Sequence, residues 1–346
     1  MMVRGSLEFG VPVMISISFN PKEFRGNKRK LQLEYAGDRD SWESFKLDLI
    51  DYAQLMIMFG ATPPYDKIIG QRIKAYDNAL YFIERITLNE KDVEPIRLNQ
   101  LGNITEPYVP SEQWSTFISL YTNNTYTAAD YIYYQEAALQ ILLKVYKDMG
   151  ETSLRYLVAW KFFWHLVQYT EPYIFLYNRP ASEACFEQVT KLMPLAVLNP
   201  FFQSEIPPHM LADANKIVKA IREAYLMALQ SSSWLSNDFR QAAVKKINDM
   251  VSYVGSPGQR LNPDFVEAYY KRFPDVPLDL DLLFPTWLKV LGLSAQYMWI
   301  DTTTPLFEET RRTPFYAYAI NAVAVPAASM LRPFMYPYGV DGLNYG

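Results

Sequence analysis

Apolar residues recur every three or four positions along most of the chain, which is the spacing of one face of an α-helix. The first such pattern begins at Asp40 or Ser41, either of which can cap a helix, and continues through Trp42, Phe45 and Leu49. A second stripe follows Pro63-Pro64 and consists of Ile69, Ile73, Tyr76, Leu80 and Ile83. The same spacing predicts further helices over 127–149, 152–170, 181–197, 209–231 and 237–253.

Four other segments depart from the ordinary amphipathic pattern. Leu154 to Tyr169 is apolar almost all round, so we expect this part of a helix to be buried. Strand-forming residues dominate from Pro314 to Val325, whereas 1–39 is irregular or weakly β and 88–110 is a polar loop. The whole pattern predicts a mainly α, multi-helix fold with a short β segment near the C-terminus.

Composition supports helices and excludes one class of partner. The chain has 346 residues, of which half are apolar and only 14 are glycine. This composition suits long helices around a sizeable core better than a turn-rich β fold. The net charge is −4, and Lys and Arg form no basic run, so we expect no nucleic-acid partner. Residues 1–20 do not resemble a signal peptide, and no stretch is apolar enough to predict a transmembrane segment.

Candidate chemistry is sparse. The histidines are His165, in the most apolar segment, and His209, which follows two prolines and is expected in the first turn of a helix. They form no His-Glu-x-x-His motif, and the single cysteine, Cys185, lies in a helical stretch typical of an inert buried thiol. No nucleophile motif or phosphate-binding loop is present. The residues themselves therefore predict no catalytic group, no metal ligand and no cofactor in this chain.

Two Asn-x-Thr sequons begin at Asn103 and Asn123. Both lie in polar stretches that we expect to be exposed. They are candidate glycosylation sites for a protein that enters the secretory route.

Several motifs resemble the neprilysin and endothelin-converting-enzyme family of zinc metallopeptidases. Ile221-Arg222-Glu223 leads to Trp234-Leu235, then to Ala243 and Lys246, and ends in Val254-Gly255-Ser256-Pro257, where the family has Ile-Gly-Tyr-Pro. The tail is the more specific match. Val323 to Phe334 is similar to the family's Ile-Val-Phe-Pro-Ala-Gly segment and its continuation, and Leu343-Asn344-Tyr345-Gly346 is identical to the tetrapeptide before the family's zinc helix. The resemblance covers residues 40 to 346.

The resemblance implies a division into three parts. An irregular N-terminal segment, 1–39, would precede a helical neprilysin-like domain, 40–275, and 276–346 would be the start of the catalytic domain. In the family a helix with His-Glu-x-x-His follows, its histidines and a later glutamate binding zinc. We therefore interpret the chain as truncated and catalytically inactive as given. One alternative is a partial sequence of a functional zinc endopeptidase, and another is a pseudoenzyme that binds peptides or proteins.

The resemblance also implies a substrate strand, in which an Asn-Ala-x-Tyr segment pairs with the peptide backbone. An ungapped alignment places Thr313, Pro314 and Tyr316 there, with Thr and Pro in place of Asn and Ala. Proline lacks the N–H that such pairing uses. A small deletion would instead make Asn321-Ala322 the motif.

The same family implies a location and a disulfide. Its members are type II plasma-membrane or secreted proteins, although residues 1–346 contain no recognisable signal or anchor. Cys185 matches a family cysteine that is usually disulfide-bonded, and its partner is absent from this sequence. Peptides are the partners that the resemblance suggests.

Overall fold

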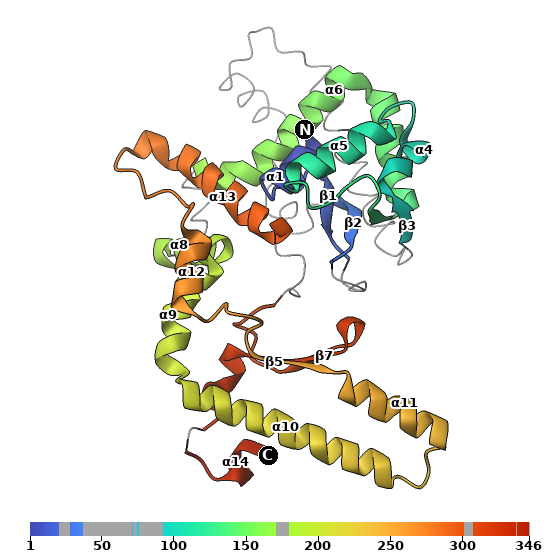
Figure 1. Ribbon diagram of the computed structural model, residues 1–346. Coiled ribbons are helices and arrows are strands. Elements are labelled where there is room, and N and C mark those ends of the chain that lie inside the picture. Colours follow the sequence, from blue (N-terminus) through green and yellow to red (C-terminus); the bar gives the residue numbers. More distant parts are fainter. Residues whose placement is uncertain are drawn as a thin grey trace. The chain divides into compact units, whose positions relative to one another are not determined.

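A computed structural model describes residues 1–20, 28–36, 71, 75, 93–170, 180–300, 307–336 and 338–345 (Figure 1). The helices predicted from Asp40 and after Pro63-Pro64 lie outside the described residues. The chain divides into two compact units. Unit 1 comprises Met1–Asn20, Lys30–Arg179 and Pro274–Ile300, and unit 2 comprises Pro21–Arg29, Pro180–Phe273 and Asp301–Gly346.

Unit 1 contains a four-stranded sheet in the order β1-β2-β4-β3. Its strands are β1 (Met14–Phe19), β2 (Leu31–Ala36), β4 (Tyr131–Tyr134) and β3 (Glu94–Arg97). β1 and β2 pair antiparallel, β2 and β4 parallel, and β3 and β4 antiparallel.

The N-terminal segment is more regular than the sequence predicted. The expectation of an irregular or weakly β segment over 1–39 is replaced by helix α1 (Met2–Glu8) and strands β1 and β2. In β1 the apolar Ile15, Ile17 and Phe19 are buried and alternate with serines, the period of a half-buried strand. This alternation covers too few residues to stand out against the helical periodicity of the rest.

Among the described helices of unit 1, α1 packs against β1, and α6 (Glu136–Thr170) packs against β1 and β2. The other described helices of this unit are η1 (Leu98–Gln100), α4 (Gly102–Thr105), α5 (Ser111–Tyr121), η2 (Leu280–Leu282) and α13 (Leu283–Ile300). The break predicted between 149 and 152 is Gly150, whose φ of 71° and ψ of 167° interrupt α6. The predicted helix start at 127 is wrong, because Tyr131–Tyr134 is a central strand paired on both sides. The predicted loop 88–110 contains β3, η1 and α4.

The core of unit 1 joins its N-terminus to α13. The Trp299 side chain is 1% exposed, its Nε1–H donates to the Leu7 carbonyl oxygen at 2.9 Å, and its ring meets Phe19 edge-on at 4.9 Å. The burial predicted for the apolar part of α6 is confirmed at Leu157 and Trp160, among others. The side chains of Trp164 and Val167 lie outside the described part.

Unit 2 combines helices with a three-stranded sheet in the order β5-β7-β6. β5 (Val251–Gly255) runs parallel to β7 (Ala322–Pro326), and β6 (Phe315–Ala317) runs antiparallel to β7. The other elements in the described part of this unit are α8 (Ala181–Leu192), α9 (Pro194–Glu205), α10 (Pro208–Ser231), α11 (Asn237–Asn248), α12 (Pro263–Tyr270), η3 (Tyr318–Ile320), η4 (Ala327–Met330) and α14 (Asp341–Tyr345). The predicted mainly α fold with a short C-terminal β segment is confirmed.

Two predicted helices of unit 2 end earlier than expected. The predicted 181–197 helix is two helices, because Met193 leaves helical geometry before Pro194 begins the next one. The predicted 237–253 helix ends at Asn248, and β5 follows because Val251 to Gly255 pair with Ala322 to Pro326. No local pattern predicts this pairing, because the partner strand β7 lies about seventy residues further along the chain.

None of the described helices has both the length and the hydropathy that a membrane span requires.

Candidate functional site

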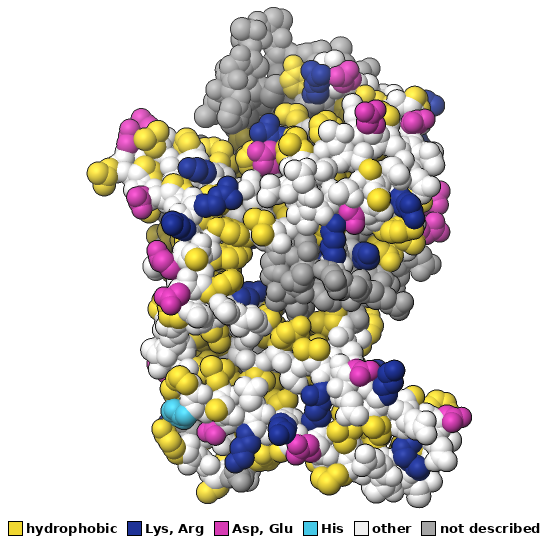
Figure 2. All heavy atoms as spheres, viewed as in Figure 1, with side chains coloured by type: hydrophobic (Ala, Val, Ile, Leu, Met, Phe, Trp, Pro, Cys, Tyr) yellow, Lys and Arg dark blue, Asp and Glu magenta, His cyan; other side chains and the backbone are white. Residues whose placement is uncertain are grey.

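A cavity of about 700 Å³ lies in unit 2 between α10, the end of α11 and the three-stranded sheet. Its walls are mostly apolar and include Ile217, Ile221, Met250, Val323, Val325, Met330 and Phe334. Figure 1 shows β5 and β7 beside the long α10, and Figure 2 shows yellow apolar side chains mixed with dark-blue Lys and Arg on this face. The cavity also contains residues that the sequence singled out: Pro314, Tyr316 and Asn321.

Tyr316, Asn321 and Lys246 form a short chain of contacts at the rim. The Tyr316 hydroxyl donates to Oδ1 of Asn321 at 2.9 Å, and Nδ2 of Asn321 donates to the Lys246 carbonyl oxygen at 2.9 Å. Nζ of Lys246 lies 5.6 Å from the centre of the Tyr316 ring. The last helical turn of α11 is therefore fastened to the β6–β7 connection.

Asn321 makes this connection possible through its backbone. Its φ of 49° and ψ of 52° are left-handed, a conformation that asparagine adopts more readily than most residues. It follows the 3-10 turn η3, so the predicted strand over 314–325 is two strands with a tight turn between them. The Val251 N–H donates to the Asn321 carbonyl oxygen at 3.0 Å, which begins the pairing with β5.

Arg222 closes the end of α11. Its Nε donates to the Ile247 carbonyl oxygen at 3.0 Å, and its Nη2 donates to the carbonyl oxygens of Asn248, at 3.5 Å, and Met250. The Ile247 and Asn248 carbonyl groups belong to the last turn of α11 and Met250 comes just after it, so the guanidinium group lies at the helix C-terminus, where a cation is favourable. The conspicuous Ile-Arg-Glu motif thus has a structural role, although Arg222 also lines the cavity.

A buried ion pair anchors the other end of β5. Nε of Arg260 lies 2.8 Å from Oε1 of Glu309, and the Ser256 hydroxyl donates to the same oxygen at 2.5 Å. Glu309 is only 4% exposed. These contacts tie the Gly255-Ser256-Pro257 turn to the segment that leads into β6, and no motif of the sequence indicated them.

The predicted substrate residues occupy different positions in the sheet. Thr313 and Pro314 are exposed and precede β6, and Tyr316 is the middle residue of β6. Ala322 is 1% exposed in the central strand β7, where it pairs with both Val251 and Ala317. β6 is at the edge of this sheet, and among the described residues its outer side has no strand partner.

One ionisable group of unit 2 has a strongly shifted pKa. Burial raises the pKa of Tyr270 from its ordinary value of 10.0 to about 12, although its hydroxyl oxygen accepts the Leu195 N–H at 3.3 Å. This side chain supports the packing of α12 and lies outside the cavity lining.

The described residues do not provide a site for the zinc ion that the family uses. In the described part of the chain, no group of three or more His, Cys, Asp or Glu side chains lies close enough together to hold a metal. His165 is half-buried in α6 of unit 1, and His209 stacks on Tyr338 at 5.1 Å in unit 2, in the first turn of α10 as predicted.

Cys185 corrects one expectation. The sequence predicted a buried thiol, but Cys185 is exposed and unpaired in the structure. It lies on the exposed side of α8, a helix that buries Ala184 and Leu192. The apolar neighbours of Cys185 in the sequence did not indicate which side of the helix its thiol is on.

The two sequons differ in their surroundings. Asn103 and Asn123 are both exposed. Thr105, the third residue of the first sequon, is fully buried, and its hydroxyl accepts the Trp114 Nε1–H at 3.0 Å. Asn123 instead lies in a turn with a φ of 54°.

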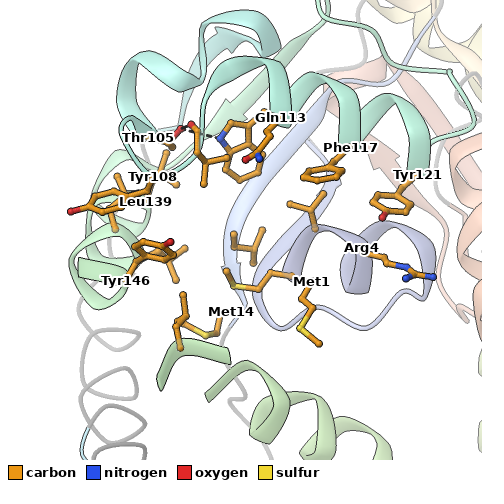
Figure 3. A pocket seen from close by; sticks show the side chains of 18 residues that line it. Met1, Arg4, Met14, Thr105, Tyr108, Gln113, Phe117, Tyr121, Leu139 and Tyr146 are labelled. Atoms are coloured by element: carbon orange, nitrogen blue, oxygen red, sulfur yellow. Dashed lines mark hydrogen bonds between the residues drawn. The ribbon is translucent and has the colours of Figure 1, made fainter. Parts of the chain in front are cut away.

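A second cavity, of about 410 Å³, lies in unit 1 between α1, α5 and α6 (Figure 3). Figure 3 shows the rings of Tyr108 and Tyr146 on one side and Arg4 pointing away from them. The centres of the two tyrosine rings are 4.8 Å apart. Arg4 forms an ion pair with Glu8 at 2.5 Å. The described residues that line this cavity are mostly apolar and include no cluster of reactive side chains.

Comparison with known proteins identifies the family. The pattern of peptidase family M13 matches residues 31–257, about two thirds of the chain. Neprilysin-1 of Trittame loki is 25% identical over 173 residues, which are 48% of this chain and 24% of that protein. Endothelin-converting enzyme 1 of Bos taurus is 24% identical over 143 residues, covering 38% of this chain and 18% of that protein.

Solved structures share the fold over nearly the whole chain. The zinc metalloprotease ZMP1 of Mycobacterium tuberculosis in its open state has a TM-score of 0.67 at 16% identity, covering 99% of this chain and 56% of that one. A Haemonchus galactose-containing glycoprotein complex has a TM-score of 0.60 at 13% identity, covering 99% and 53%. The chain thus spans less than a quarter of the matched sequence relatives and just over half of these structures. By its sequence match, it belongs to peptidase family M13, the neprilysin family of zinc metallopeptidases.

Proposed function

We propose that residues 1–346 hold extended peptides along the outer edge of β6 and do not hydrolyse them by themselves. The supporting observation is the position of β6, an edge strand on the rim of the apolar cavity. An extended peptide adds to such an edge through backbone hydrogen bonds. Hydrolysis is not expected of these residues, because no His-Glu-x-x-His zinc motif occurs among them.

Tyr316 is the residue of this edge that we assign to peptide contact. It is 42% exposed and lines the cavity. Asn321 has a positioning role in this proposal, because its amide oxygen and nitrogen bond to Tyr316 and Lys246. Pro314 limits the usable edge on one side, since it has no N–H to donate. Peptides should therefore pair from Phe315 onward.

Peptides with a modified backbone test this proposal. Binding of labelled, extended peptides to the 346-residue chain is measured by fluorescence anisotropy. We expect N-methylation of alternate residues, in one of the two registers, to weaken binding about fivefold per lost hydrogen bond, at about 1 kcal/mol each. The same peptides with unmodified backbones are the control. Equal affinity of both N-methylated registers and the unmodified peptide would contradict pairing along a strand edge.

Catalysis is tested in the same samples. With zinc added, we expect no chelator-sensitive cleavage of these peptides and no stoichiometric zinc binding. Chelator-sensitive cleavage by the pure chain would overturn the non-catalytic part of the proposal while leaving peptide binding intact.

A second candidate function is a catalytic one, in which this sequence is part of a longer zinc endopeptidase. It is favoured by the fraction of the relatives that the chain spans, 24% for neprilysin-1 and 56% for ZMP1. Reading the transcript beyond the Gly346 codon separates the two. A downstream His-Glu-x-x-His would favour the endopeptidase, and a stop codon would favour the truncated, non-catalytic product, including a peptide-binding pseudoenzyme.

We further propose a secreted or plasma-membrane location, with glycosylation at Asn123 in preference to Asn103. The exposed turn at Asn123 supports this choice, as does the burial of the Thr105 hydroxyl. Expression in a secretory host, followed by glycopeptide analysis of both sequons, tests it.

A further inference from the structure

Strand β6 carries a cation on each of its two faces. Nζ of Lys246 lies 5.6 Å from the centre of the Tyr316 ring, and the guanidinium carbon of Arg311 lies 4.1 Å from the centre of the Phe315 ring. Phe315 and Tyr316 are successive residues of the strand, so their side chains point to opposite faces of the sheet. Each cation is therefore held by an aromatic ring on a different face of the same edge.

Neither cation has a carboxylate partner among the described residues. Glu309, close in sequence to Arg311, is committed to Arg260 and buried. Glu308 is exposed and accepts the Thr310 hydroxyl at 3.0 Å. An aromatic ring attracts a cation through its quadrupole but does not neutralise the charge. Both positive charges thus remain available to a ligand.

Arg222, the other cation of the cavity lining, is different. Its guanidinium group is occupied by the carbonyl oxygens at the end of α11. The described cavity lining contains no Asp or Glu, so its charged groups are the cations Arg222 and Lys246. The cavity side of β6 is therefore positive among the described residues, although the whole chain has a net charge of −4.

We propose that the β6 edge selects extended peptides with acidic side chains at two adjacent positions. This inference rests on the peptide binding proposed above and adds the class of peptide. In an extended ligand, adjacent side chains also point to opposite faces. One carboxylate then meets Lys246 and the next meets Arg311, whereas acidic residues two positions apart reach only one of these cations.

Three labelled peptides of equal length, about seven residues each, test the arrangement against the 346-residue chain. One has two adjacent Glu residues, one has two Glu residues separated by one position, and one has Gln at all these positions. The two acidic peptides carry the same net charge, so a difference between them reports geometry rather than general attraction. Binding is measured by fluorescence anisotropy at low and high salt.

We expect each matched carboxylate to strengthen binding about two- to fivefold, which corresponds to an exposed ion pair. The adjacent-Glu peptide should bind most tightly, the separated-Glu peptide less tightly and the Gln peptide least. High salt should reduce these differences.

Variants assign the effect to the two cations. Lys246→Met and Arg311→Met should each remove about one carboxylate's contribution, so that the adjacent-Glu peptide loses more affinity than the Gln peptide does. Lys246→Arg should retain the preference. The matched control is Lys245→Met, because Lys245 is an exposed neighbour on the same helix outside the cavity lining. If a Lys246 variant misfolds by circular dichroism, Arg311→Met and the three-peptide comparison still decide the question.

Two results would overturn the inference in distinguishable ways. Equal affinity for the adjacent-Glu and Gln peptides would overturn the acidic preference and leave peptide binding in place. Failure of all three peptides to bind would overturn the proposed function, and the inference with it.

Discussion

The two units bury their apolar residues to different extents. Unit 1 has an extensive cluster of buried side chains that includes both ends of its sequence, such as Leu7 and Trp299. The buried cluster described in unit 2 is much smaller and centres on residues such as Phe202 and Met330. In unit 2, apolar side chains on α10 and nearby remain exposed, among them Ile221, Tyr225, Met227, Trp234 and Phe239.

This difference indicates which interactions stabilise each unit. In unit 1, burial of apolar area is the main stabilising contribution. In unit 2, polar ties such as Arg260–Glu309 and Asn321–Lys246 join elements that the small core does not hold. Exposed apolar surface of the kind on α10 is typical of a protein that contacts another polypeptide. The comparison leads to three predictions about stability.

The largest effect is expected from Trp299→Ala in unit 1. The substitution removes a buried ring and the hydrogen bond to Leu7, so we expect the free energy of unfolding to fall by about 3–5 kcal/mol. Trp234→Ala is the control, because Trp234 in unit 2 is 83% exposed, and its loss should change the value by less than about 0.5 kcal/mol. Urea denaturation followed by circular dichroism measures both. Similar losses for the two tryptophans would remove the contrast between the units.

An intermediate effect is expected from Glu309→Gln in unit 2. The change leaves Arg260 without its buried counter-charge and should cost about 2–3 kcal/mol, somewhat less than full truncation of a buried pair. Glu308→Gln changes the exposed neighbouring carboxylate and should be near neutral. Hydrogen exchange of the β5, β6 and β7 amides, compared with those of β1, shows whether the loss is confined to unit 2. Uniform loosening of both units would argue against polar ties that act locally.

The smallest effect concerns the alkaline stability of unit 2. The pKa of Tyr270 is about 12 in the folded chain, above its ordinary value of 10.0, so the native state holds this proton more tightly than the unfolded state. Its contribution is fully present below pH 10 and is lost as the pH rises from about 10 to about 12. In this range we expect the free energy of unfolding to fall by about 1 kcal/mol per pH unit, after allowance for the partial exposure of the side chain.

Tyr270→Phe should flatten this slope, because phenylalanine has no proton to lose. It also removes the acceptor for the Leu195 N–H. The variant should therefore be about 1 kcal/mol less stable at neutral pH. An unchanged slope between pH 10 and 12 in the variant would show that other groups govern alkaline unfolding.

The sequence predicted elements whose signals are local. α10 lies within one residue of its predicted range, because its apolar spacing is long and prolines mark its start. The first three residues of β5, 251–253, were predicted as helix because the pairing of β5 with β7 is decided by residues about seventy positions away, beyond any local window of sequence. The first two strands were predicted only as an irregular or weakly β segment, because their alternation covers few residues.

At the candidate site too, features with a local sequence signal were predicted and features that depend on long-range contacts were not. Family motifs indicated Pro314, Tyr316 and Asn321, and the structure brings all three to one cavity. Their link to Lys246 and the Arg260–Glu309 pair depend on contacts across long sequence separations, so neither was predicted. The exposure of Cys185 was missed because the side chain's direction depends on the register of α8.

Pro314 and the two ring-held cations have a consequence for how copies of this protein behave in solution. An open strand edge invites pairing with the same edge of another molecule. At β6 such pairing would begin beside a proline that donates no hydrogen bond and would bring Lys246 and Arg311 of one molecule toward the same cations of the other. Self-association through this edge is therefore disfavoured at low ionic strength. It becomes easier as salt weakens the repulsion.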